Sequence, residues 1–261
     1  MNKVKLAWYG KHLGEEPPLV PAGGIFFSGC NLHCVFCQNY QISQENLGKF
    51  YSVEELADIV LQLQKDSAVN IDLVTPTIWY KQIKQALIIA KSRGLVIPIV
   101  WNSNGYEDIK ILKEMEGLVD IYLPDFKYSD DDLALKYSGV KNYTEVALNA
   151  VKEMLRQVGN FKNNRGVIVR HMVLPNNLAN SFGVLQKLAE IDLDLYISLM
   201  NQYFPMHNAK DFPELTHTVS EKEFKQVYEY LQELGFHNGW VQGEKSQNNL
   251  IPDFRKVEPF E

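Results

Sequence analysis

The chain has 261 residues, enough for one large domain or two small ones, and its 46% hydrophobic and 22% charged residues are typical of a globular protein with a sizeable core. Its formal net charge of −6, with no block of Lys or Arg, argues against nucleic acid as a partner, although a locally basic pocket is compatible with it. No signal-peptide core follows the N-terminus, and no segment approaches the roughly 18 apolar residues of a membrane span. We therefore expect a cytoplasmic protein with no membrane partner.

Short buried strands alternate with helices along most of the chain. After an irregular lead-in that includes residues 9–11 and 15–18, the predicted strands cover residues 24–29, 71–75, 96–101, 118–123, 166–174 and 193–200. The predicted helices cover residues 53–66, 80–92, 105–116, 130–137, 142–158, 180–190 and about 220–234. Apolar strands separated by helices indicate a parallel sheet with both faces covered, in an open sheet or a barrel. Six repeats before residue 200 favour a partial (β/α)6 TIM-like barrel over a full eight.

The chain ends and connections indicate one domain over residues 1–261. Ser52 is a candidate N-cap with Glu55 at capping-box spacing. No linker rich in Gly or Ser divides the chain. We expect a core over about residues 20–205, followed by a C-terminal helix and tail over 206–261, the tail loosely structured from Glu244.

Three cysteines, the only ones in the chain, lie within eight residues. Cys30, Cys34 and Cys37 form a C-x3-C-x2-C motif directly after the first predicted strand, and their odd number in a reducing compartment excludes a disulfide framework. Three thiolates in one loop can hold an iron-sulfur cluster and leave one of four irons open. The alternative is a zinc site completed by His33 or another residue, but no second pair of ligands follows downstream.

This motif resembles the C-x3-C-x-Φ-C signature of the radical S-adenosylmethionine (SAM) superfamily. Phe36 stands in the aromatic position that contacts adenine, and residues 28–39 look most like the pyruvate formate-lyase activating enzyme branch, in particular its small group of activating-enzyme-like proteins. The resemblance runs over about residues 20–205. It implies a radical SAM oxidoreductase in which a 4Fe-4S cluster, reduced by a flavodoxin or ferredoxin type donor, cleaves SAM to a 5′-deoxyadenosyl radical.

The segment after the third predicted strand resembles the family's D/N-T-N-G loop. Asn102, Ser103 and Asn104 are followed by Gly105, and the resemblance implies that their side-chain oxygens lie near the SAM carboxylate and a bound monovalent cation. The alternative is a plain turn, because Asn-Gly is a strong turn former.

The end of the fourth predicted strand resembles the family's D-x-K element. The resemblance implies that Asp125 lies near the cation and Lys127 near the SAM carboxylate. In an extended chain the two side chains lie on the same face, so they can act together. The alternative is a solvated surface ion pair.

An arginine stands alone in the apolar strand 166–174. Arg170 needs an anionic partner there, either the SAM carboxylate or a nearby acid, and the family has an arginine in the same R-x-x-V-L-P context. His171 points to the opposite face and is expected to be structural. Asn201 and Gln202 fall where relatives place a SAM-contacting histidine.

One motif departs from the family. Relatives carry a G-G-E-P element after the second strand that grips the SAM amino group, whereas this chain has Val-Thr-Pro-Thr at residues 74–77. The hydroxyl groups of Thr75 and Thr77, with local carbonyls, are acceptors that can bind an ammonium group. The small group of activating-enzyme-like proteins, which is poorly characterised, shows a similar replacement.

Three functions are compatible with these residues. The first is an activase that abstracts hydrogen from a glycine of a partner protein, which a barrel open on one side would admit. The second is a radical SAM enzyme for a small molecule or another macromolecule. The third is a non-catalytic iron-sulfur or zinc protein, which only the altered element at residues 74–77 favours.

Overall fold

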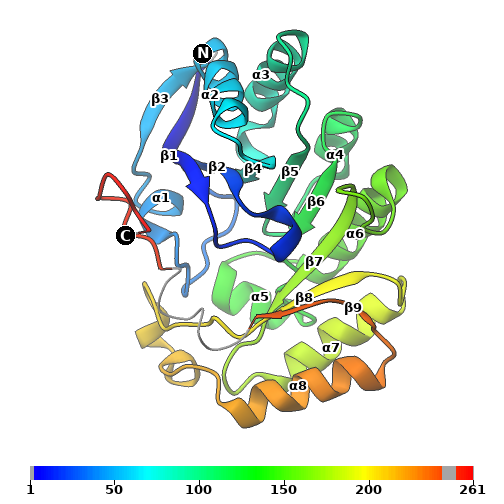
Figure 1. The fold of residues 1–261 in the computed structure, drawn as a ribbon. Helices are drawn as coiled ribbons and strands as arrows, with labels where there is room; N and C mark the ends of the chain where they lie inside the picture. Colours follow the sequence, from blue (N-terminus) through cyan, green and yellow to red (C-terminus); the bar gives the residue numbers. More distant parts are fainter. Residues whose placement is uncertain (1–2, 243–250, 261) are drawn as a thin grey trace.

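The computed structural model describes residues 3–242 and 251–260 and is built around nine strands (Figure 1). The strands are β1 (Lys3–His12), β2 (Ala22–Phe27), β3 (Lys49–Ser52), β4 (Asn70–Val74), β5 (Ile99–Ser103), β6 (Ile121–Pro124), β7 (Gly166–Met172), β8 (Tyr196–Met200) and β9 (Asn238–Gln242). Their order across the sheet is β3-β1-β2-β4-β5-β6-β7-β8-β9. Neighbours from β2 to β9 are parallel, whereas β1 pairs antiparallel with β2 and β3.

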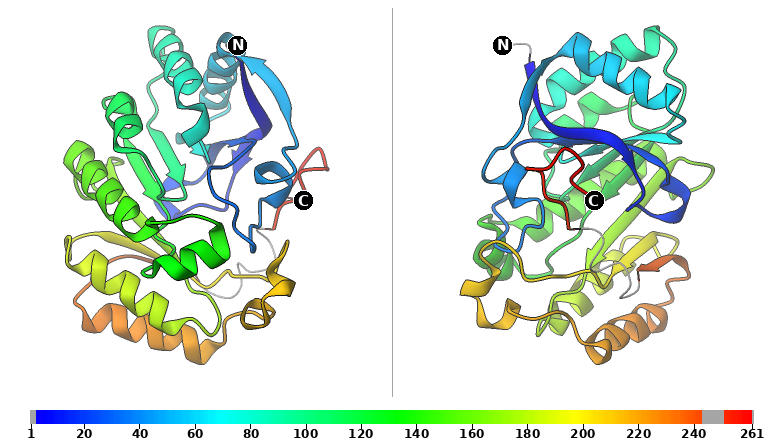
Figure 2. Two further views of the ribbon diagram at one scale, coloured as in Figure 1. Left: turned by 180° about the vertical axis from the view of Figure 1, so that it is seen from behind. Right: turned by 60° about the vertical axis from the view of Figure 1, so that its left-hand side comes forward.

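Helices cover the outer face of this curved sheet (Figure 2). The helices are α1 (Tyr40–Ser43), α2 (Val53–Lys65), α3 (Tyr80–Ser92), α4 (Ile109–Met115), α5 (Asp131–Ser138), α6 (Tyr143–Val158), α7 (Leu178–Ala189) and α8 (Glu221–Glu233), with short 3-10 helices η1 (Pro17–Leu19), η2 (Thr77–Trp79), η3 (Ala209–Asp211) and η4 (Pro213–Leu215). The parallel strands β2 to β8, excluding the antiparallel β3, are each followed by a helix, which confirms the partial TIM-like barrel that the sequence predicts. Among the described helices, none combines the length and apolar character needed to cross a membrane.

All six predicted strands and all seven predicted helices are present, and all but the helix over residues 80–92 have shifted ends. β5 begins at Ile99 rather than at residue 96, because Pro98 has no N–H for the ladder and Val96 is 84% exposed. α4 begins only at Ile109, where the Asp108 side chain accepts a hydrogen bond from the N–H of Lys110 at 2.8 Å. The predicted capping box is confirmed: Ser52 and Glu55 exchange hydrogen bonds of 2.6 and 3.1 Å at the start of α2.

The predicted irregular lead-in is wrong over residues 9–11. These residues belong to β1, which lies between β2 and β3 and buries Val4 and Leu6 on one face. A seventh parallel strand, β9, also extends the six predicted ones. Of the tail predicted from Glu244, residues 244–250 lie outside the described residues, and residues 251–260 form turns that pack against β1 and β2.

The barrel interior changes from apolar to polar along the strands. Val100, Leu123 and Ile168 belong to an apolar cluster that also contains Leu19 from η1. Because alternate residues of a strand share a face, the next inward positions are Asn102 on β5, Asp125 after β6 and Arg170 on β7. Polar side chains therefore gather toward the carboxyl ends of the strands, where loops of parallel barrels form binding sites.

Candidate functional site

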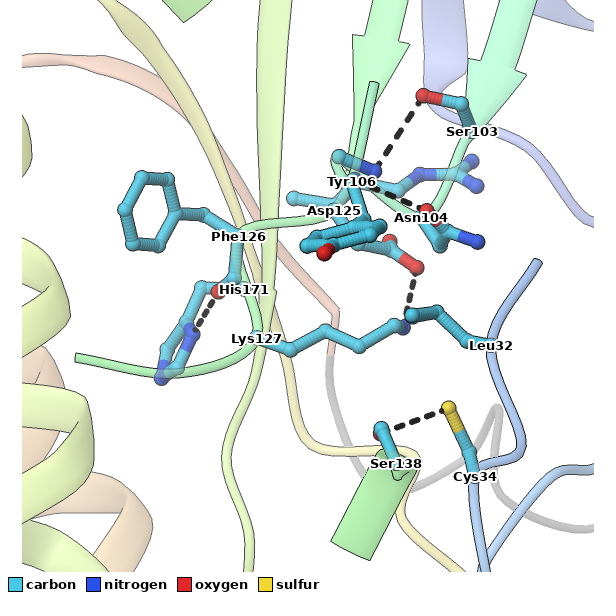
Figure 3. A network of polar contacts seen from close by, with 12 residues as sticks. Leu32, Cys34, Ser103, Asn104, Tyr106, Asp125, Phe126, Lys127, Ser138 and His171 are labelled. Carbon is cyan, nitrogen blue, oxygen red and sulfur yellow. Dashed lines mark hydrogen bonds and ion pairs between the residues drawn. The ribbon is translucent and has the colours of Figure 1, made fainter. Parts of the chain in front are cut away.

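The loop between β2 and α1 brings the three cysteine sulfurs to the carboxyl end of the barrel. Cys34 is buried and Cys30 and Cys37 are partly buried. Each Sγ has a polar side chain within hydrogen-bond distance. The Nδ2 of Asn104 donates to Cys30 at 3.3 Å, and the Oγ of Ser43 lies 3.2 Å from the Sγ of Cys37. The Oγ of Ser138 lies 3.0 Å from the Sγ of Cys34 (Figure 3).

Burial makes these thiols poor acids in the absence of a bound cation. Burial raises the pKa of all three thiols, and the charges of neighbouring thiols add to this effect for Cys30 and Cys37. The pKa of Cys37 rises to about 12. Iron-sulfur clusters bind thiolate, so a metal cluster would supply the positive charge that stabilises three thiolates together. The donor set therefore fits a cluster with three protein ligands.

The zinc alternative needs a fourth ligand, and His33 does not provide it. Its Nδ1 lies 2.7 Å from the Oε1 of Gln44 on the exposed side of the loop, and His33 does not line the cavity that contains the cysteines. Within the described ranges, no three His, Cys, Asp or Glu side chains are grouped closely enough to hold a single metal ion. A cuboidal cluster separates its ligands more widely than one ion does.

One cavity at this end of the barrel collects most of the site residues that the sequence predicts. The predicted residues that line it are Cys30, Cys34, Phe36, Cys37, Thr75, Asn102, Ser103, Asn104, Asp125, Lys127 and Arg170. Gln202 also lines it, whereas Asn201 is buried outside the lining. Further lining residues that the sequence did not reveal include His12, Glu15, Phe26, Met172, Met200 and Phe260.

Asn104 joins the loop after β5 to the cysteine loop. Besides its bond to Cys30, its Nδ2 donates to the Oδ1 of Asn31 at 2.7 Å, and its Oδ1 accepts from the N–H of Tyr106 at 2.9 Å (Figure 3). Asn102 instead donates to the buried Asp72 on β4, at 3.2 Å. The segment is thus a turn that also contacts a cysteine sulfur, and its contacts to SAM and a cation stay a prediction.

Asp125 and Lys127 form an ion pair, as their alternation predicts, with 2.5 Å between Oδ2 and Nζ. Their side chains are only 25% and 17% exposed and line the cavity, so the pair is not a solvated surface pair. Burial by itself would lower the pKa of Lys127, but the charges of Asp125 and of the Cys34 thiol outweigh it and raise the pKa. Lys127 therefore stays cationic and extends toward the cysteine loop (Figure 3).

The nearby acid expected for Arg170 is Glu16, together with Glu15. The Nε and Nη2 of Arg170 donate to the two carboxylate oxygens of Glu16 at 2.7 and 2.6 Å, and Nη2 also contacts Glu15. Burial opposes ionisation of Glu16, but Arg170 more than compensates and lowers the pKa of the carboxyl group. The sequence signal for these acids is weak, because they follow β1 at a separation of 154 residues from Arg170.

The altered element after β4 forms a strained turn. Thr75 has a φ of +59°, a region that a β-branched residue rarely adopts, and its N–H donates to the carbonyl of Asn102 at 2.9 Å. Thr77 does not line the cavity, because its hydroxyl group donates to the buried Glu107 at 2.7 Å. Of the two predicted hydroxyl groups, only that of Thr75 lies on a residue that lines the cavity.

Phe36 and His171 lie in different environments. Phe36 is 4% exposed and packs edge-on against Tyr203, with ring centroids 5.8 Å apart, while one side of it lines the cavity. His171 is structural, as predicted: its ring nitrogens lie 2.7 Å from the carbonyl of Phe126 and 2.9 Å from the hydroxyl of Ser181 (Figure 3).

The chain matches one family model and is similar in sequence to two known proteins. Residues 25–189 match the family model described as the Radical SAM superfamily. The chain is 32% identical over 243 residues to an uncharacterized protein of Methanocaldococcus jannaschii, a match that covers 88% of this chain and 68% of that protein. It is 26% identical over 243 residues to the pyruvate formate-lyase-activating enzyme of Clostridium pasteurianum, covering 85% of this chain and 97% of that enzyme.

Among solved structures, SuiB of Streptococcus suis bound to the precursor peptide SuiA has a similar fold. The TM-score is 0.58 at 12% identity, over 82% of this chain and 47% of the SuiB chain.

Proposed function

The chain belongs to the radical SAM superfamily, and we propose that Cys30, Cys34 and Cys37 hold its 4Fe-4S cluster while the other lining residues of the cavity bind SAM. When bound, the cluster and SAM supply the electron transfer and the 5′-deoxyadenosyl radical chemistry of the superfamily. The observation that carries the proposal is the gathering of three sulfurs, each with a polar hydrogen-bonding partner, in the cavity lined by the eight predicted SAM residues.

The residues of this chain bind and orient in distinct ways. Lys127, cationic and held by Asp125, offers an ammonium group for the SAM carboxylate. Phe36 offers a ring edge or face for adenine, because aromatic rings stack on nucleobases. Thr75, at the strained turn, offers a hydroxyl acceptor for the SAM amino group.

Polar contacts to the SAM carboxylate are also expected from the loop after β5 and from β7. Asn102 and Ser103 offer an amide and a hydroxyl group, and Arg170 has its Nη1 3.4 Å from the Oδ1 of Asn102, so its remaining donor is directed to this part of the cavity. A monovalent cation near Asp125 stays a prediction, since Lys127 already occupies one carboxylate oxygen. Asn104 is also predicted to bind SAM, and its Nδ2 donates to the Sγ of Cys30.

The substrate that we propose is a glycine residue of a partner protein. Similarity to a pyruvate formate-lyase-activating enzyme over nearly its whole length supports this assignment. The sheet has two free edges, β3 and β9, and an incomplete wall of this kind leaves one side through which a loop of a partner can reach the cavity. A flavodoxin or ferredoxin type protein is the proposed electron donor.

Anaerobic reconstitution followed by a SAM cleavage assay tests the proposal. We expect about four irons per chain, from the stoichiometry of the cluster, and release of 5′-deoxyadenosine with dithionite and SAM. A candidate glycyl-radical protein should stimulate the cleavage and acquire a glycyl radical detectable by electron paramagnetic resonance. A cluster without SAM cleavage would favour the non-catalytic alternative, and cleavage without radical transfer to any such protein would favour another substrate.

A further inference from the structure

Residues 251–260, which we name the 251–260 segment, cover one side of the cavity that contains the cysteines. The segment lies across β1 beside α1, far from its neighbours in sequence on β9 (Figures 1 and 2). Phe260 lines the same cavity as Cys30, Cys34 and Cys37. The wall on this side is therefore supplied by a segment that adds no strand to the sheet within the described residues.

Two phenylalanine rings attach the segment to the barrel. Phe260 packs against Trp8 on β1, His12 and Phe26, with ring centroids 5.2, 4.4 and 5.3 Å apart. Phe254 packs against Phe26 at 5.5 Å and belongs to a small apolar cluster separate from the main core. Because this cluster is separate, the segment can leave without disturbing the main core.

The polar contacts of the segment fall on the residues that follow the cysteine loop. Gln41 on α1 accepts a hydrogen bond from the N–H of Phe254 at 2.7 Å and donates to the Oδ1 of Asp253 at 3.0 Å. The N–H of Asp253 donates to the carbonyl of Pro259 at 2.8 Å, so the segment closes on itself as a turn. A closed turn held by side chains can move as a unit, because no ladder of backbone bonds must break.

We propose that the 251–260 segment is a displaceable gate over the side of the cavity, and that the substrate enters where Phe254 and Phe260 now pack. The second half of this statement rests on the proposed function, whereas the gate itself requires neither the cluster nor SAM. Opening would expose Cys30, Cys34 and Cys37 to solvent from the side. A ligand that enters there would compete with the ring of Phe260 for the same space.

Thiol reactivity in the reduced, metal-free full chain tests the gate directly. The chain has only three cysteines and all line this cavity, so the rate of reaction with 5,5′-dithiobis(2-nitrobenzoate) reports access to it. We expect Phe254→Ala to raise this rate about tenfold, because the removed ring stabilises the closed state by burial. Neither Phe254 nor Gln41 lines the cavity, so changes at these residues alter access only through the position of the segment.

Val257 provides the matched control, since it belongs to the segment but is 88% exposed. Val257→Ala should react at the wild-type rate, and Gln41→Ala should show a severalfold increase even if Phe254→Ala proves poorly folded by circular dichroism. Wild-type rates in both Phe254→Ala and Gln41→Ala, at unchanged urea midpoints, would overturn the gate. Because the readout uses no SAM, this result and a failure of SAM cleavage are independent.

Discussion

Gly105 lies directly against the backbone of Asp125: a Cβ placed on Gly105 would be 2.1 Å from the carbonyl oxygen of Asp125. The φ of Gly105 is +77°, in the left-handed region that glycine tolerates best. The contact fixes the loop that carries Asn104 against the loop that carries Lys127. Two sets of predicted SAM contacts thus depend on a residue with no side chain.

Substituting this glycine should be far more costly than substituting a comparable one elsewhere. Gly105→Ala should lower the free energy of unfolding by about 3 kcal/mol or more, because the strained φ and the clash add. Gly94→Ala is the matched control: its φ is +100° and nothing lies within 4 Å of the added Cβ, so about 1 kcal/mol is expected. Urea unfolding measures both, and equal losses would contradict the close approach.

The cysteine assignment predicts a sharp difference between neighbouring residues. Cys34→Ala should lose the cluster and its brown absorbance on anaerobic reconstitution, because an incomplete ligand set cannot hold the cube. His33→Ala should retain about four irons per chain, since the His33 ring contacts Gln44 instead of a metal site. Iron and sulfide assays measure the loading. Loss of metal in His33→Ala, or zinc in place of iron in the wild type, would refute the assignment.

The buried lysine should matter for SAM affinity. Lys127→Met removes a charge-assisted contact worth about 1.5–3 kcal/mol, so the Kd for SAM should rise roughly 10- to 100-fold. Lys84→Met removes a lysine whose ion pair with Glu114 is on the surface, with side chains 35% and 48% exposed, and should leave the Kd unchanged. Equilibrium dialysis with reconstituted protein measures both constants. An unchanged Kd in Lys127→Met would remove Lys127 from the SAM site.

The sequence predicts the repeating part of this fold well because its signals are local. The helix over residues 80–92 has the bounds of α3, and Ser52 caps α2 as its spacing with Glu55 indicates. The loops that hold Asn104 and Lys127 could be placed because carboxyl ends of parallel strands meet at one end of a barrel. Eleven of the predicted site residues therefore line one cavity, whereas Thr77 and Asn201 do not.

The remaining features could not be predicted because they depend on contacts between distant segments. β1 escaped prediction because Val4 and Leu6 alternate with lysines over only four residues, a weak local signal, and the rest of the strand is defined by antiparallel pairing with β2 and β3. Phe260 reaches the cavity from more than 200 positions beyond the cysteines, and nothing in its local sequence indicates this. Long-range pairing of this kind is set by packing, which periodicity does not report.

The buried pair of Arg170 and Glu16 should contribute to the response of stability to pH. Arg170→Met would leave the fully buried Glu16 carboxylate without its cation and should lower the free energy of unfolding at pH 7 by about 3–5 kcal/mol. Arg93→Met, which removes an ion pair with side chains 49% and 60% exposed, should cost about 1 kcal/mol or less.

The sign of the pH effect follows from the depressed pKa of Glu16 in the folded chain. Burial opposes this shift and Arg170 produces it, so the stabilisation is complete above the unfolded pKa of about 4.3 and is lost as the pH falls through the lower folded value. In Arg170→Met the charge and hydrogen bonds of Arg170 no longer oppose burial, the largest influence, so the pKa of Glu16 should rise and the carboxyl group should protonate more readily. The stability gap between wild type and Arg170→Met should therefore narrow as the pH falls from 7 toward 4. Urea unfolding at several pH values measures it, and a constant gap would show that the cost of the substitution arises from lost packing instead of the Glu16 charge.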